Sequence, residues 1–267
     1  MNQVERGACE LHEMDELAAR QSPIHSLCPL AKLLTTIAYL VTVLSFRKYD
    51  LSGVTVMLLY PVLLFQLSGI PVRTCFHKLR FVLPLVMAVG LFNPFFDRQP
   101  MLTLGALTLS GGVISMLTLM LKGVFCLMTA FLLMATTSID ALCAALRRLR
   151  LSGMPVTLLL LTYRYVGIMA EEAAAMTDAY HLRAPGQRGI RFSAWGSFLG
   201  QLLLRSMDRG SELYSGMQLR GFRGEFHYAA MKPWRWSDTV YLTVCVALFL
   251  VFRLFHLAQL LGSLLVR

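Results

Sequence analysis

Five long apolar stretches that contain no acidic residue constrain this chain more than any other feature. They cover residues 30–46, 51–70, 80–96, 113–137 and 239–262. A transmembrane helix needs about 17–25 predominantly apolar residues, so we predict that each stretch is a membrane span. Only 15% of the residues are charged, whereas soluble domains carry about 25%. The sequence therefore predicts an all-α, polytopic membrane protein with about five transmembrane helices, and it argues against a water-soluble enzyme.

Basic residues predict the orientation of these spans. The chain has 25 Lys and Arg against 15 Asp and Glu, a formal net charge of +10. They gather at 73–80, after the second stretch, and at 147–150, after the fourth. Cytoplasmic loops are enriched in Lys and Arg, so both segments are expected inside the cell and residues 97–112 outside. Counting back places the N-terminus in the cytoplasm. The third stretch is short and interrupted by proline and glycine, so we expect it to be kinked or re-entrant.

The spans divide the chain into four parts. These are a polar cytoplasmic N-terminal segment at 1–29, a membrane domain of four spans at 30–137, a cytoplasmic domain at 138–236 and a final transmembrane helix with the C-terminus at 237–267. The cytoplasmic domain has 13 Lys and Arg and 7 Asp and Glu, with few Gly and Pro clusters. This pattern favours long amphipathic helices over a flexible linker. No stripe of alternating basic and aromatic residues accompanies the charge, so nucleic acid is not an expected partner.

Two long helices are predicted within the cytoplasmic domain, at about 155–182 and 192–219. Pro155 suits a first helical turn, and Gly221 suits the cap that ends the second helix. A shorter helix is expected at 139–149. The apolar start of the first long helix leaves open an entry into the bilayer. On the second long helix, we expect two ion pairs at i,i+3 spacing, Arg205–Asp208 and Arg209–Glu212.

Motifs for catalysis are missing. No lysine follows a glycine, so the chain has no ATPase phosphate loop, and it has no Gly-x-Ser-x-Gly. The histidines do not pair at i,i+4, and the spans lack the carboxylates that ion-coupled carriers usually hold. We therefore expect no enzyme activity and no catalytic, cofactor-binding or metal site on this chain. Lys122, near the middle of the fourth span, either faces a neighbouring helix or serves a translocation path.

The two long predicted helices end alike, at Leu182-Arg183-Ala184 and at Leu219-Arg220-Gly221. A cation at a helix C-terminus stabilises the helix by about 0.3–1 kcal/mol through the macrodipole, which is one account of both arginines. The other account is a paired docking device, in which each arginine enters a groove on one of two copies of a partner. Arginine suits such a role because its guanidinium pairs bidentately with carboxylates. The residues alone leave both accounts open.

Several segments resemble the motifs of a known family. They include the lead-in Ile24–Leu34, the Asn-Pro segment Phe92–Phe96 and Tyr163-Arg164-Tyr165. The most specific is the string Arg205-Ser206-x-x-Arg209-x-x-Glu212-x-Tyr214-x-x-Met217-x-x-Arg220-Gly221-Phe222-x-Gly224. From Ile24 onward the chain resembles the transmembrane T component of energy-coupling-factor (ECF) transporters, in its cobalt-transport CbiQ form. Cys28 stands where the family usually has Asp, and both arginine triplets depart from the family's Ala-Arg-Gly in their flanks.

The resemblance implies a subunit that transmits force without catalysis. It implies two cytoplasmic ABC ATPase partners, which bind ATP and Mg, and a substrate-binding membrane subunit, with or without a small accessory membrane subunit. By resemblance the ATPases contact Leu182, Arg183, Ala184, Leu219, Arg220 and Gly221, with support from Arg205, Arg209 and Glu212. Cobalt or nickel uptake in a bacterial or archaeal cell membrane is the implied function. A vitamin ECF transporter, a stand-alone secondary carrier and a membrane scaffold remain alternatives.

Overall fold

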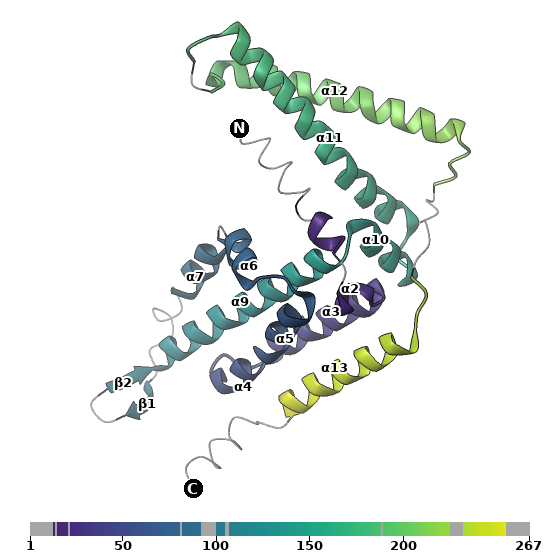
Figure 1. The fold of residues 1–267 in the computed structure, drawn as a ribbon. Coiled ribbons are helices and arrows are strands. Elements are labelled where there is room, and N and C mark those ends of the chain that lie inside the picture. The colour runs from purple at the N-terminus through teal and green to yellow at the C-terminus, as the bar shows by residue number, and fades with distance from the viewer. Residues whose placement is uncertain are drawn as a thin grey trace. The chain divides into compact units, whose positions relative to one another are not determined.

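The computed structural model describes residues 13, 15–20, 22–80, 82–91, 100–104, 107–187, 189–224 and 232–254. The Asn-Pro segment and the predicted end of the fifth span, 255–262, lie outside the described residues. In chain order the elements are α2 (Pro23–Ser26), α3 (Pro29–Ser45), α4 (Leu51–Val56), α5 (Leu59–Ser68), α6 (Val72–Leu79), α7 (Leu83–Leu91), β1 (Pro100–Leu104), β2 (Leu107–Ser110), α9 (Gly111–Thr136), α10 (Ile139–Arg148), α11 (Gly153–Arg183), α12 (Phe192–Leu219) and α13 (Trp236–Leu254) (Figure 1).

The chain separates into two compact units. The first, which we call the bundle unit, comprises Ala18–Thr137 and Lys232–Arg267. The second, which we call the long-helix unit, comprises Met1–Leu17 and Ser138–Met231. The chain therefore leaves the bundle unit after Thr137 and returns to it at Lys232.

Apolar helices confirm a polytopic α-helical membrane protein. Among the described residues, four helical stretches are long and apolar enough to cross a membrane, namely Leu51–Ser68, Gly111–Thr136, Gly153–Arg183 and Trp236–Leu254. The shorter α3 is also apolar, so four of the five predicted spans coincide with an apolar helix. In the third predicted span, α7 has nine residues. α11 differs from the sequence prediction, which placed this helix in the cytoplasmic domain. It is long and apolar enough to cross a membrane because its first half is strongly apolar.

An aromatic cluster forms part of the core of the bundle unit. Tyr39 of α3, Tyr60 of α5 and Phe249 of α13 are all buried. Their ring centroids lie 4.8 Å apart for Tyr39–Tyr60, 4.9 Å for Tyr60–Phe249 and 5.4 Å for Tyr39–Phe249. Such pairs contribute about 0.5–1.5 kcal/mol each beyond the apolar area they bury. The Tyr39 hydroxyl also donates to the Met57 carbonyl at 3.0 Å, in the break between α4 and α5.

A two-stranded hairpin interrupts the helical pattern. β1 and β2 pair antiparallel, with Leu104 opposite Leu107 and Thr103 opposite Thr108. The sequence prediction treated 97–112 as a loop, although leucine and threonine alternate here with the period of two that typifies strands. The hairpin is short and leaves the all-α class of the fold unchanged.

The long-helix unit holds α10, α11 and α12. α10 begins after Ser138, whose hydroxyl caps the helix by accepting from the Ala141 N–H at 3.4 Å. α11 packs against both α10 and α12. α11 has 31 residues and α12 has 28, so the predicted pair of long helices is confirmed, and α12 has the predicted bounds. No side chain of α12 is buried.

Candidate coupling surface

The first predicted arginine lies at the last helical position of α11. Arg183 ends the helix and is exposed, while Leu182 before it is 84% exposed. Ala184 is the C-cap, and its N–H donates to the Tyr180 carbonyl at 3.0 Å. The Tyr180 hydroxyl in turn donates to the Gln187 side chain at 2.9 Å. These contacts tie the loop after the helix to its last turn, so Arg183 projects from a fixed end.

The second predicted arginine lies one position later relative to its helix. Arg220 is the C-cap of α12, and Gly221 follows with a φ of +80°. The Phe222 N–H donates to the Met217 carbonyl at 3.0 Å, and the Gly221 N–H donates to the Gln218 carbonyl at 2.9 Å. This pair of bonds is the Schellman motif, which needs a left-handed residue after the cap. The predicted role of Gly221 in ending the helix is therefore confirmed.

Both helix ends are solvent-facing within this chain. Leu219 is 90% exposed, and Arg220 and Gly221 are exposed too. Within the described part of the chain, neither Arg183 nor Arg220 forms an ion pair. A large exposed leucine beside a guanidinium offers an apolar and a charged contact at once, and arginine is enriched in protein interfaces.

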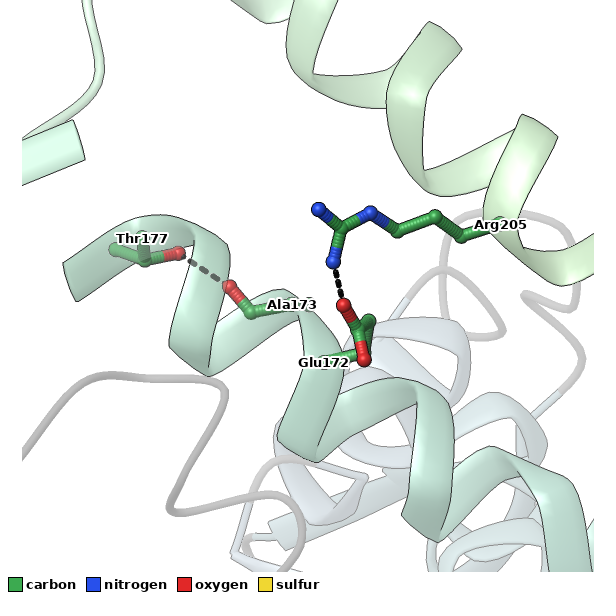
Figure 2. Close-up of polar contacts among 4 residues, drawn as sticks. All are labelled: Glu172, Ala173, Thr177 and Arg205. Atoms are coloured by element: carbon green, nitrogen blue, oxygen red, sulfur yellow. Dashed lines mark hydrogen bonds and ion pairs between the residues drawn. The ribbon is translucent and has the colours of Figure 1, made fainter. Parts of the chain in front are cut away.

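An ion pair links the two long helices. Arg205 of α12 pairs with Glu172 of α11, and Figure 2 shows their side chains meeting between the helices. The sequence predicted Asp208 as the partner of Arg205, and Glu172 was missed. Arg209 does pair with Glu212 at 3.8 Å, as predicted.

A buried hydroxyl lies near this ion pair on α11. The Thr177 hydroxyl donates to the Ala173 carbonyl at 2.7 Å (Figure 2).

A second tether holds the first half of α11. The Tyr163 hydroxyl donates to the Asp15 carboxylate at 2.9 Å. Tyr163 belongs to the Tyr-Arg element noted in the sequence, whereas Asp15 lies in the N-terminal segment, 148 residues earlier. The structure therefore gives this motif tyrosine a partner that spacing along the chain could not reveal.

The sequence predicts an apolar face on α12 at Leu199, Leu203, Met207, Tyr214 and Met217. In the described part of the chain most of this face is exposed, and Met217 is half-buried. Leu199, Leu203, Met207 and Tyr214 are each more than half exposed. Their spacing places them on one side of the helix. Four large exposed apolar side chains on one face indicate a surface that binds a partner, because monomeric soluble proteins rarely expose a large apolar patch.

Two basic side chains from neighbouring helices, Lys122 of α9 and Arg253 of α13, cap the C-terminal end of α3. The Lys122 ammonium donates to the Phe46 carbonyl at 2.5 Å, and Arg253 donates to the Ser45 carbonyl at 3.0 Å. The Arg253 guanidinium also lies 4.8 Å from the centre of the Phe46 ring. The last carbonyls of a helix have no partner within the helix. Lys122 therefore faces a neighbouring helix, the first of the two readings left open by the sequence.

The cysteines and histidines do not assemble a metal site among the described residues. No group of three or more His, Cys, Asp or Glu side chains gathers there. His25 and Cys28 lie three residues apart, but the His25 ring bonds with the Ser22 hydroxyl at 2.6 Å. Burial raises the pKa of the Cys75 thiol to about 11 and also raises that of Cys143, where the nearby Asp140 adds to the effect. Thiols with raised pKa values are poor nucleophiles. Cys9, His12, His227 and His256 lie outside the described residues.

Comparison with known proteins gives the family of the chain. The cobalt transport protein family, CbiQ, matches residues 20–228. A cobalt transport protein CbiQ of Rhodobacter capsulatus is 38% identical over 104 residues, which are 38% of this chain and 42% of that protein. A nickel permease, LarQ, of Lactiplantibacillus plantarum is 24% identical over 117 residues, 44% of this chain and 43% of that protein. The matches thus span less than half the length of either relative.

The fold and the exposed helix ends define a multi-pass membrane protein with two long helices that present arginines at their ends. The family match covers well over half of the chain. The chain belongs to the CbiQ cobalt transport protein family.

Proposed function

We propose that this chain is the energy-coupling transmembrane component of an ECF-type importer. The observation that supports the proposal most strongly is the pair of exposed arginines, Arg183 and Arg220, at the ends of two long helices joined by an ion pair. Two equivalent helix ends suit two copies of one partner, which is the arrangement that an ATPase dimer offers. The chain itself has no ATP-binding loop, so hydrolysis belongs to those partners, which bind ATP and Mg.

The transported ion is cobalt or nickel. The family is described as a cobalt transport protein, and the two relatives are named for cobalt and for nickel. The cargo is held by a separate substrate-binding membrane subunit, which docks on the uncovered apolar face of α12 at Leu199, Leu203 and Met207. A vitamin as cargo is the second candidate, because the ECF transporters that the sequence resembles include vitamin transporters. Direct uptake assays with cobalt, nickel and vitamins distinguish these substrates.

The long-helix unit lies on the cytoplasmic side of the cell membrane, with the N-terminus on the same side. The charge asymmetry supports this orientation, because the basic residues Arg147, Arg148 and Arg150 lie at or just after the end of α10, the short helix that follows α9. Closing and reopening of the ATPase dimer moves the two helix ends, and the helices transmit this motion to the substrate-binding subunit. The chain performs no chemistry of its own in this mechanism.

Charge reversal at the helix ends tests the proposal. Arg183→Glu or Arg220→Glu replaces a charge-assisted contact with repulsion, and losing one partner of such a contact costs about 2–5 kcal/mol. Each single variant should co-purify with less ATPase, and the double variant with none. All three variants should remain in the membrane. Arg191→Glu, in the loop between the helices, serves as a control for a general loss of positive charge. A double variant that retains the wild-type amount of ATPase refutes the proposed role of the helix ends.

A further inference from the structure

The first crossing of the chain out of the bundle unit is held by a buried lysine. The Lys32 ammonium, in the second turn of α3, donates to the Thr136 carbonyl at 2.7 Å. Lys32 is only 5% exposed. Thr136 is the last residue of α9, and the chain leaves the bundle unit one residue later. The contact therefore fixes the end of α9 to the start of α3 at the exit to the long-helix unit.

The return crossing is held at the same place. The Lys232 ammonium donates to the His25 carbonyl at 2.9 Å, and Lys232 is the first residue of the bundle unit after the long-helix unit. The Cys28 thiol donates to the Lys232 carbonyl at 3.8 Å. His25 and Cys28 are both buried, just before α3 begins. The exit after Thr137 and the return at Lys232 thus both contact residues 25–32.

A buried carboxylate completes this cluster. Asp238, in the first turn of α13, is 2% exposed. One of its oxygens accepts from the Cys28 N–H at 2.9 Å and the other from the Arg235 N–H at 2.8 Å. The second bond is half of a capping box, in which the third helical residue bonds back to the cap. Asp238 thereby joins the start of α13 to the start of α3.

Charged side chains are uncommon in a buried contact that holds helix ends together. Burying a charge is costly unless hydrogen bonds satisfy it, and breaking such a contact leaves the charge without compensation. Lys32 makes one such bond and Asp238 makes two. Each of these bonds has a preferred direction, so the contact resists small displacements. An apolar contact, in contrast, would tolerate sliding because it has no preferred direction.

We propose that Lys32 and Asp238 are positioning residues for energy coupling, which fix the exit after Thr137 and the return at Lys232 to the start of α3. The inference rests on the proposed function. Movement of the long helices then reaches the bundle unit as one displacement of α3, α9 and α13 together. Neither residue contacts the ATPases or the cargo in this mechanism. Their loss should separate ATP hydrolysis from uptake without preventing assembly.

The chain supplies a matched control at the other end of the same helices. Lys122 of α9 donates to the Phe46 carbonyl after α3, just as Lys32 of α3 donates to the carbonyl at the end of α9. Each lysine lies 14 residues before the capped end of its own helix, since 46 − 32 and 136 − 122 are both 14. Lys122→Met and Lys32→Met therefore each remove a lysine that caps a neighbouring helix, from a half-buried and a buried position respectively, and only Lys32 lies at a crossing into the long-helix unit.

The experiment measures metal uptake and ATP hydrolysis on the same complex in proteoliposomes. We expect Lys32→Met to reduce the uptake per ATP hydrolysed at least fivefold, with ATPase binding retained. Lys122→Met should leave this ratio within twofold of wild type, although it should also lower the melting temperature of the complex. Lys32→Arg, which keeps a charged donor, should restore at least half of the ratio. A ratio unchanged by Lys32→Met, or reduced equally by both lysine variants, would overturn the proposal.

A second variant keeps the test decisive if Lys32→Met does not accumulate. Asp238→Asn preserves the size of the side chain but loses one acceptor, so it should also reduce uptake per ATP at least threefold. An unchanged ratio in this variant contradicts the proposal as well. Failure of the proposed function would appear differently, because the wild-type chain itself would then bind no ATPase or show no ATP-dependent uptake.

Discussion

Stiffness of α12 is a requirement of the coupling mechanism, and Met207→Pro tests it. Met207 lies in the middle of α12 and is 61% exposed, and no side chain of this helix is buried. Changing its side chain therefore removes little packing within this chain. Any contact that Met207 makes with the substrate-binding subunit is lost in Met207→Ala as well, so the difference between the two variants comes from the backbone. A proline inside a helix removes one hydrogen bond and clashes with the preceding turn, at a cost of about 3 kcal/mol or more. Since about 1.4 kcal/mol is tenfold in an equilibrium, the straight helix loses about two orders of magnitude in relative stability.

The assay compares uptake with hydrolysis in the reconstituted complex. Both helix-end arginines remain in Met207→Pro, so ATPase docking should survive at least partly. Uptake should fall much further than hydrolysis, because the break separates the Arg220 end of α12 from the half that contains Leu199 and Leu203. Met207→Ala is the matched control, since alanine removes the same side chain and favours a helix. Wild-type uptake and hydrolysis in Met207→Pro would show that α12 is only a tether.

The remaining predictions concern topology, the helix cap and the ion pair between the long helices. An impermeant cysteine reagent applied to sealed cells should label a probe at Gln99 and miss one at Gln187, and labelling at the latter would contradict the orientation. Gly221→Ala forces a side chain into a left-handed conformation at about 1–2 kcal/mol, so ATPase docking should weaken. Gly210→Ala, in open space within α12, should leave docking unchanged. Glu172→Gln breaks a partly exposed pair that contributes less than about 1 kcal/mol, so we expect only a small drop in melting temperature, and a complete loss of assembly would be inconsistent with this reasoning.

Local patterns in the sequence predicted the long helices well. The bounds of α12 and the cap at Gly221 followed from helical periodicity and from the left-handed preference of glycine, both of which act within a few residues. The Arg209–Glu212 pair also depends on one helical turn alone. Membrane spans were predictable because hydropathy is a property of each segment by itself. For α11, hydropathy does not decide the location. Its first half is apolar enough for a membrane span, yet this composition does not show whether the helix lies inside or outside the membrane.

Contacts between distant segments could not be predicted from one sequence. Arg205 selects Glu172, 33 residues away, because α11 and α12 pack side by side, whereas spacing alone suggested Asp208. Lys32 and Lys122 likewise cap each other's helices, which depends on how α3 and α9 pack. The arginine motif was visible in the sequence, yet the exposure of its arginines required the structure.

The central claim is that the two helix ends contact two ATPase copies, and site-specific photo-crosslinking tests it most directly. Leu182 and Leu219 are the most exposed leucines at the two ends, so each is replaced in turn by a photo-reactive benzoylphenylalanine. Leu158, which is exposed near the start of α11, is the control position. We predict that each end position captures one ATPase subunit, that the double replacement captures two, and that Leu158 captures none. Crosslinks from Leu182 and Leu219 only to another membrane subunit, or to no protein, would contradict the account.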